Sequence, residues 1–485
     1  MIKNERQYKI TKASAKKFAE ALTVKRAAGF DVDPMIAKAS YAAAASQLEE
    51  LKQQIGEYEA LRSGSLEILE VESLEDLPSM LIKARIAANL SQRELAARLN
   101  LKEQQIQRYE ETDYAGASLA KLIEISRALH LKVKHEAVLG ANPSNVEKLL
   151  GRLGKVGLPK DLLTRRLVSR DVVQGYRDDP DRTASVLISD LVANLKRIFG
   201  WSNTELLGTT PLTFASDALG SAQFKLRERR NEKRVSAYTV YAHYLAMLVL
   251  QSTRHCEARK LPNTPQDFYD NVCLQYQDMT FENALRYVWS LGIAVLPLED
   301  EGAFDGAYWR VQGRHVIVLK QNSHSASRWL FDLLHDYRHA TQRPHLNDSE
   351  VVELPPTSEE RREAPDEVDA SNFAGEVILA GHDKELIRAC ELATGGRLPR
   401  LKAVLPDVAK EIGVDISAAA NFMAYQLSLD GTNWWGTAAN LQAVGESPWL
   451  TARNVFLEHV KFGALSAPDR RLLVDALTEE EREYE

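Results

Sequence analysis

The spacing of apolar residues along most of the chain is that of amphipathic α-helices, with apolar positions recurring every three or four residues. Near the N-terminus, residues 12–28 and 34–61 both show this period. The pattern changes only in short stretches: 293–298 is a continuous apolar run, and 306–311 and 315–320 flank the turn Gln312-Gly313-Arg314 like the strands of a hairpin. The chain is therefore expected to be mostly α with a small β-sheet.

Residues 79–132 hold four short helical periods in close succession. Ser91 followed by Glu94 has the spacing of a capping box, which starts a helix at Gln92. Asn100 is predicted to end that helix in a tight turn, and a third helix follows from Lys102. A plain four-helix bundle would not require the small Ala96 near the turn or the polar Gln92, Gln104 and Gln105 on the outer face. These residues favour two helices that cross closely.

This segment, S-Q-x-E-L-A-x-x-L followed by I-x-x-Y-E, resembles the Cro/C1 (XRE) helix-turn-helix family. The resemblance implies a four- or five-helix DNA-binding bundle, here placed at residues 76–134, that binds a double-stranded operator as a homodimer. Residues 79–132 contain nine Lys and Arg against six Asp and Glu, a net charge of +3 in a chain of net charge −7. Positions on the third helix predict base contacts by Gln104, Gln105 and Arg108, with Gln92 and Lys102 at phosphates or a flanking base.

The remaining chain divides by pattern into four further parts. Residues 1–75 form a helical N-terminal region, either a spacer or a dimerisation arm, and 135–234 a helical connector. Residues 235–440 contain the predicted strands, and 441–485 form a C-terminal helical extension. Within residues 235–440, the segment 343–366 is polar and rich in proline, so it is predicted to be a surface loop.

The candidate chemistry lies after the predicted hairpin. His335 and His339 are four residues apart in a helical period, so both imidazoles project from one face and can bind one cation. A third ligand is required, and Glu367 is the best candidate because it opens a second helical period 28 residues after His339. A structural alternative is that both histidines are polar residues on an otherwise packed helix.

The two segments, Leu333-Leu334-His335-Asp336-Tyr337-Arg338-His339 and Glu367-Val-Asp-Ala-Ser-Asn-Phe-Ala374, resemble the ImmA/IrrE metallopeptidase family. That family has H-E-x-x-H followed by E-x-x-A-N-x-F-A, so Asp336 replaces its glutamate and Asn372 is displaced by one place. The resemblance implies a zincin-like α+β domain in which His335, His339 and Glu367 bind zinc and Asp336 is the general base. It also implies a protein substrate, a helix-turn-helix repressor or the chain itself, in a stress, mobile-element or phage response.

Two alternatives stay open. The chain is also consistent with a non-catalytic transcription factor whose degenerate peptidase domain senses a ligand or partner, and with an antitoxin-like regulator. Composition bears on the cellular compartment. The three cysteines are widely spaced and make no disulfide framework, and no secretory or membrane segment is recognisable. A cytoplasmic protein with no membrane partner is expected.

Overall fold

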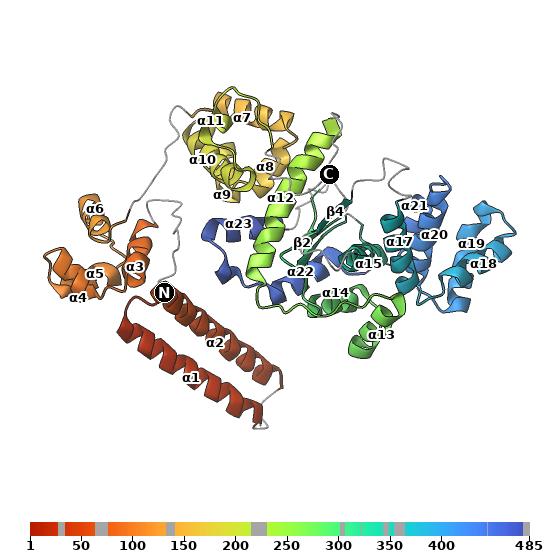
Figure 1. Cartoon of the computed structure of the whole chain (residues 1–485), viewed down its shortest axis with the longest axis horizontal. Coiled ribbons are helices and arrows are strands. Elements are labelled where there is room, and N and C mark those ends of the chain that lie inside the picture. The colour runs from red at the N-terminus through yellow and green to blue at the C-terminus, as the bar shows by residue number, and fades with distance from the viewer. Residues whose placement is uncertain are drawn as a thin grey trace. The chain divides into compact units, whose positions relative to one another are not determined.

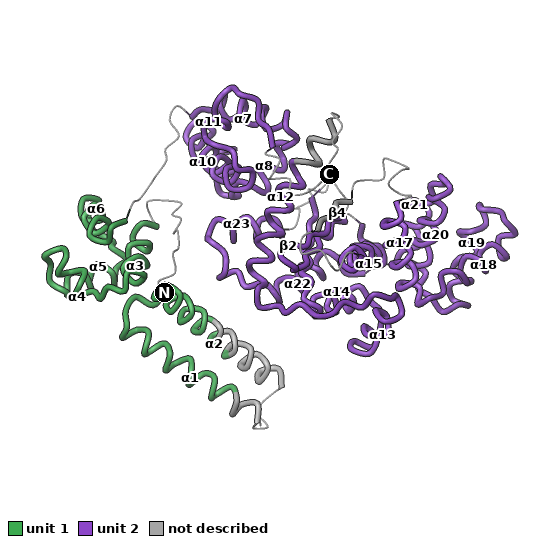
Figure 2. The backbone as a smooth tube through the Cα atoms, viewed as in Figure 1, with its two compact units in different colours: residues 1–136 green, residues 137–485 purple. Residues whose placement is uncertain are grey.

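The computed structural model describes residues 1–27, 34–63, 76–131, 141–214, 230–300, 306–321, 323–342, 349–353, 364–443 and 445–478. The chain separates into two compact units, residues 1–136 (unit 1) and 137–485 (unit 2), coloured separately in Figure 2. Most described residues are helical, and one small sheet lies in unit 2 (Figure 1). No helix among the described residues is both long enough and apolar enough to span a bilayer.

Unit 1 consists of a long helical hairpin and four short helices. The helices are α1 (Glu5–Ala27), α2 (Pro34–Arg62), α3 (Leu77–Ala87), α4 (Gln92–Arg98), α5 (Glu103–Glu111) and α6 (Leu119–Ala128). The two predicted N-terminal helices are confirmed, and Tyr8 of α1 stacks on Tyr58 of α2 with ring centroids 5.0 Å apart. The short helices enclose one apolar core that includes Leu81, Leu95 and Ile106, and none of these three side chains is exposed.

Unit 2 begins with a helical part. Its helices are α7 (Pro143–Lys155), α8 (Lys160–Arg166), α9 (Arg170–Asp178), α10 (Pro180–Phe199) and α11 (Asn203–Leu207). They share one core with the sheet-containing part that follows. The buried ion pair between Arg166 of α8 and Asp300, with Nε and Oδ1 2.6 Å apart, joins these two parts.

The sheet has four strands in the order β1-β3-β2-β4. The strands are β1 (Ile293–Leu298), β2 (Gly306–Val311), β3 (Arg314–Lys320) and β4 (Ser349–Glu353). β1 pairs parallel with β3, whereas β2 is antiparallel to both β3 and β4. The predicted hairpin and the strand before it are therefore confirmed. The predicted loop at 343–366 is wrong at residues 349–353, which form β4 because β2 offers them a free edge, and at 365–366, which begin the helix Pro365–Ile378. Residues 343–348 and 354–363 lie outside the described residues.

The helices of this part continue to the C-terminal end. They are α12 (Arg230–Ser252), α13 (Pro265–Tyr276), α14 (Phe281–Ser290), α15 (Ala326–Gln342), α17 (Pro365–Ile378), α18 (Asp383–Thr394), α19 (Leu401–Ile412), α20 (Ile416–Leu429), α21 (Trp435–Ala439), α22 (Pro448–His459) and α23 (Ala467–Ala476). Of these helices, α12, α14, α15 and α22 pack against the sheet. The central helix is α15, which packs against α14, α17, α20, β2 and β3. It carries both histidines of the predicted site.

Candidate functional site

The helix α15 holds His335 and His339 in a fixed orientation because its other faces are packed. Leu333, Leu334 and Tyr337 are completely buried. Its first turn is fixed by the indole of Trp329, whose Nε1 donates to the carbonyl oxygen of Ser323 at 2.7 Å. A helix anchored in this way presents the two imidazoles one turn apart on one face.

The helix α17 brings Glu367 to that face. Pro365 occupies its first turn, and the buried residues Ala370, Phe373, Ala374 and Val377 pack it inward. Arg338 of α15 ties the two helices together, since its Nε lies 2.7 Å from Oδ2 of Asp369. Burial alone would raise the pKa of Asp369, but hydrogen bonds from Arg338 and Gln342 hold that pKa below its ordinary value.

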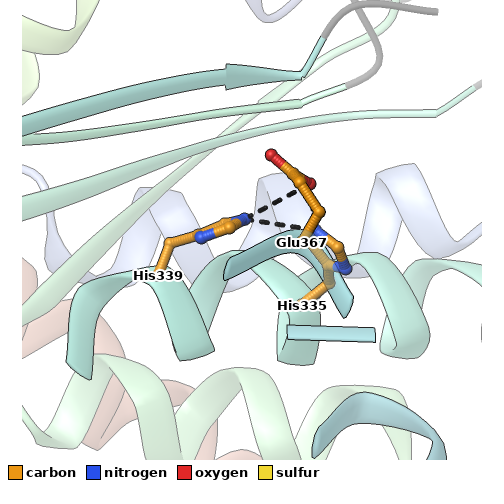
Figure 3. Close-up of side chains that lie close together, drawn as sticks. All are labelled: His335, His339 and Glu367. Carbon is orange, nitrogen blue, oxygen red and sulfur yellow. Dashed lines mark hydrogen bonds and ion pairs between the residues drawn. The ribbon is translucent and has the colours of Figure 1, made fainter. Parts of the chain in front are cut away.

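Three ligand-type atoms converge where the helices meet (Figure 3). Nε2 of His335 lies 3.2 Å from Nε2 of His339 and 3.3 Å from Oε2 of Glu367. The third separation, between Nε2 of His339 and the same oxygen, is 3.8 Å. The His339 side chain is fully buried, whereas those of His335 and Glu367 are 11% and 17% exposed.

The outward ring nitrogens have partners of their own. Nδ1 of His339 lies 2.9 Å from Oε1 of Gln342, and Nδ1 of His335 lies 3.3 Å from the hydroxyl of Ser371. The amide nitrogen of Gln342 donates to the carbonyl oxygen of Asp366 at 2.7 Å and to Asp369 at 3.0 Å. Because both of these groups are acceptors, the Gln342 oxygen must face His339, and Nδ1 of His339 must carry the proton. Its Nε2 is then a lone pair aimed into the cluster.

Asp336 is placed differently from the three clustered residues. It lies on α15 and is 1% exposed. Among the described residues, the group that could hold a metal ion consists of His335, His339 and Glu367 and does not include Asp336. The structure therefore brings together the three predicted ligands, whereas a general-base role for Asp336 stays a prediction.

The second candidate region is in unit 1, where α4 and α5 are joined by a sharp turn. Ser91 Oγ accepts from the backbone nitrogen of Glu94 at 3.1 Å, and the Glu94 carboxylate accepts from the backbone nitrogen of Ser91 at 2.7 Å. The predicted capping box is thus confirmed, and the hydrogen bonds from Ser91 lower the pKa of Glu94. Asn100 has φ +53°, the left-handed conformation that asparagine tolerates in a tight turn.

A buried ion pair fixes α5 to α3. Arg85 Nε lies 2.5 Å from Oε1 of Glu110, and their side chains are 4% and 0% exposed. Gln92, at the start of α4, donates from Nε2 to the other oxygen of Glu110 at 2.8 Å. One carboxylate therefore sets the positions of three helices, while Lys102, Gln104 and Arg108 stay exposed along α5.

Comparison with known families decides the nature of this region, because residues 81–134 match the family model HTH_3, described as Helix-turn-helix. Residues 81–134 form a helix-turn-helix domain. The predicted Cro/C1-type, DNA-binding character of this part of the chain is thereby confirmed. No curated protein and no solved structure matches the chain.

Within the helix-turn-helix domain, two predicted DNA contacts also have structural roles. Gln105 Oε1 accepts from the backbone nitrogen of Lys102 at 3.0 Å and so closes the first turn of α5. Gln92 is half-buried through its bond to Glu110. The sequence signal for the capping role of Gln105 was the spacing Lys102-x-x-Gln105. The contacts to DNA predicted for Gln92, Lys102, Gln104, Gln105 and Arg108 stay predictions.

The residues that sequence reasoning missed are the partners of the histidines. Gln342 lies three positions after His339, so helix geometry places its side chain within reach of that imidazole. Ser371 occupies the place at which the resembled family has asparagine. Both are polar residues beside a predicted ligand, and that is the available sequence signal.

Proposed function

We propose that this chain is a DNA-binding regulator whose unit 2 holds one zinc ion at His335, His339 and Glu367 and hydrolyses a peptide bond. The observation that carries the proposal is the convergence of three atoms: Nε2 of His335, Nε2 of His339 and Oε2 of Glu367. The proton of His339 is on Nδ1, which faces Gln342, so its Nε2 is available to a cation. Lone pairs and a carboxylate oxygen that face one another at 3.2 to 3.8 Å repel unless a cation or a proton lies among them.

The separations are compatible with a tetrahedral zinc ion. Tetrahedral zinc holds nitrogen and oxygen ligands at about 2.0–2.1 Å, which places neighbouring ligand atoms about 3.3 Å apart. The separations in the cluster are 3.2, 3.3 and 3.8 Å. Two imidazoles and one carboxylate also match the ligand types of catalytic zinc sites, which leave a fourth position for water.

When bound, zinc lowers the pKa of a coordinated water from about 15.7 to about 7. Gln342 and Ser371 hold the imidazoles. Asp336 is assigned the proton transfers, from the attacking water and then to the leaving amine. Its carboxylate ends about 1.5 Å short of a glutamate's reach, the length of one C–C bond.

The proposed substrate is a helix-turn-helix repressor or this chain itself. Support comes from the resemblance of both histidine and glutamate segments to the ImmA/IrrE family and from the presence of a DNA-binding domain in the same polypeptide. A homodimer is proposed with it, since helix-turn-helix dimers read two half-sites about one helical turn apart.

A second candidate function is a metal-binding sensor without peptidase activity. One specific observation favours it: Asp336 stands where the resembled family has glutamate, and its carboxylate is shorter by one C–C bond. A carboxylate displaced by 1 Å from its reacting atom costs on the order of a hundredfold in rate. A site of this kind would bind the metal but would not hydrolyse a peptide bond.

Cleavage of a co-expressed helix-turn-helix protein, or of the chain itself, separates the two functions when fragments are identified by mass spectrometry. If the chain is a peptidase, the wild type cleaves the substrate, Asp336→Asn keeps the metal but loses cleavage, and Asp332→Asn cleaves like the wild type. Asp332 is a matched control because it lies one turn earlier on α15 and accepts a hydrogen bond from Gln321 at 2.8 Å.

Asp336→Glu is the complementary variant, predicted to preserve or increase cleavage because it restores the missing reach. Adding a methylene at a buried position costs about 1–3 kcal/mol, so its folding is checked by tryptophan fluorescence. Cleavage that survives Asp336→Asn removes Asp336 from the mechanism. Absence of cleavage in every form, including Asp336→Glu, favours the sensor.

A further inference from the structure

The most positively charged helix of unit 1 lies outside the helix-turn-helix domain. The α1 sequence contains seven Lys and Arg against two Glu, a net charge of +5, although the whole chain has a net charge of −7. Its neighbour α2 contains three Lys and Arg against four Glu, a net charge of −1. The positive charge is thus concentrated on one helix of the hairpin.

Four of the basic side chains of α1 point away from α2, whereas Lys12 turns toward it and pairs with Glu59, with Nζ and Oε1 3.1 Å apart. Ala15 and Leu22 are buried, and Tyr8 stacks on Tyr58, which defines the packed face. Four exposed cationic residues occupy the opposite face: Arg6, Lys9, Lys16 and Lys17. At 1.5 Å and 100° per residue they form a stripe about 16 Å long and roughly 100° wide.

The start of α1 is attached to the helix-turn-helix domain. Ile2 is 3% exposed and belongs to that domain's core cluster. Lys3 Nζ donates to the carbonyl oxygen of Glu110, near the end of α5, at 2.6 Å and pairs with Asp113 at 2.8 Å. In return, Nη2 of Arg85 donates to the carbonyl oxygen of Lys3 at 2.6 Å. These bonds fix α1 to the same ion pair that orients α5.

The first turn of α1 opens on a cavity that is also lined by Gln92, one of the five predicted DNA contacts. Arg6 and Gln7 line a cavity of about 630 Å³ together with Gln92, Glu103 and Gln107. Glu103 accepts a hydrogen bond from Gln107 at 3.0 Å. The cationic stripe therefore begins beside the start of α4 and runs outward along α1.

We propose that the face of α1 defined by Arg6, Lys9, Lys16 and Lys17 binds the phosphate backbone of the duplex that flanks the operator. The proposal rests on DNA binding by the helix-turn-helix domain. Duplex DNA carries one charge per about 1.7 Å of axis, so a stripe about 16 Å long faces several phosphates. Contacts of this kind carry no base specificity and extend the footprint beyond the domain.

The test is the salt dependence of binding by the full chain to a random-sequence duplex of about three helical turns. Each phosphate contact contributes about 0.9 to the slope of log affinity against log salt. Replacing Arg6, Lys9, Lys16 and Lys17 together by Gln is expected to lower that slope by roughly 3, because up to four contacts are lost.

The matched control removes the same four charges from unit 2, at exposed positions of α18 and α19: Lys384, Arg388, Lys402 and Lys410, each changed to Gln. The control is expected to keep the wild-type slope. An unchanged slope in the α1 variant, or an equal fall in both variants, overturns the inference. A wild type without affinity for any duplex overturns DNA binding itself, which is a distinguishable failure.

A second measurement does not depend on the folding of a variant. Reductive methylation of the wild-type chain with and without the duplex reports which lysines the DNA covers. Protection of Lys9, Lys16 and Lys17, with Lys52 of α2 equally modified in both states, supports the proposed surface. Equal modification of all four lysines with and without DNA contradicts it.

Discussion

Gln342 accepts a hydrogen bond from Nδ1 of His339 at 2.9 Å, and this bond decides which nitrogen of the imidazole is available to a cation. The amide cannot be reversed without placing its oxygen against the acceptors Asp366 and Asp369, 2.7 and 3.0 Å from its nitrogen. The ring is therefore held with its Nε2 lone pair directed at His335 and Glu367. Partners of this kind also raise the basicity of a ligand.

Gln342→Ala is predicted to weaken zinc binding by about 10- to 100-fold, because the imidazole loses its fixed tautomer and orientation. Zinc affinity of the full chain is measured by competition with a chromophoric chelator. The control is Gln321→Ala, since Gln321 binds Asp332 on the same helix at 2.8 Å. Equal affinities in wild type and Gln342→Ala would show that Gln342 does not position the ligand.

The buried ion pair of unit 1 predicts a large and localised loss of stability. Glu110→Ala leaves Arg85 charged and buried, which costs about 3–5 kcal/mol. The surface pair Arg62–Glu5, with side chains 46% and 50% exposed, provides the contrast: Glu5→Ala is expected to cost at most about 1 kcal/mol.

Hydrogen exchange of the α3–α6 amides measures this loss, because all seven tryptophans lie in unit 2 and their fluorescence reports only that unit. Glu110→Ala should accelerate exchange in α3–α6 and leave tryptophan fluorescence unchanged. Similar protection in Glu110→Ala and Glu5→Ala would mean that the ion pair does not hold the domain together.

Arg108 is predicted to read a base, since it is exposed on α5, on the side away from the buried Ile106. On a duplex selected from a random pool, Arg108→Ala should cost about 1–3 kcal/mol and relax the preference at one position of the site. Arg98→Ala is the control, because Arg98 bonds the carbonyl oxygen of Ala128 within the domain at 3.1 Å. Equal losses on selected and random duplexes would assign Arg108 to phosphate instead.

The sequence predicted what depends on local spacing. The four-residue interval of His335 and His339 fixed their common helix face, and Ser91 with Glu94 fixed the start of α4. The position of Glu367 depended on a second helix packing against the first. The helical period that begins at Glu367 and the family resemblance both indicated this residue, but local spacing cannot show the packing. The packing of α17 on α15 supplies that contact.

The sequence could not predict what depends on partners distant in the chain. The strand Ser349–Glu353 is five residues long and lies in a polar, proline-rich stretch, so only its pairing with β2 makes it a strand. The role of Gln342 could not be predicted because its amide partners lie on α17. Gln92 looked like a free DNA contact because its partner Glu110 is 18 residues away.

The central claim is that three residues from two helices form a metal site, and the metal content of purified protein tests it most directly. Elemental analysis of full-chain protein prepared without chelators is predicted to find about one zinc per chain. His335→Ala, His339→Ala and Glu367→Ala should each lose that zinc, whereas His382→Ala should keep it, because His382 pairs with Glu385 elsewhere on the surface. Wild-type protein without stoichiometric metal, or equal zinc in all four variants, would contradict the account.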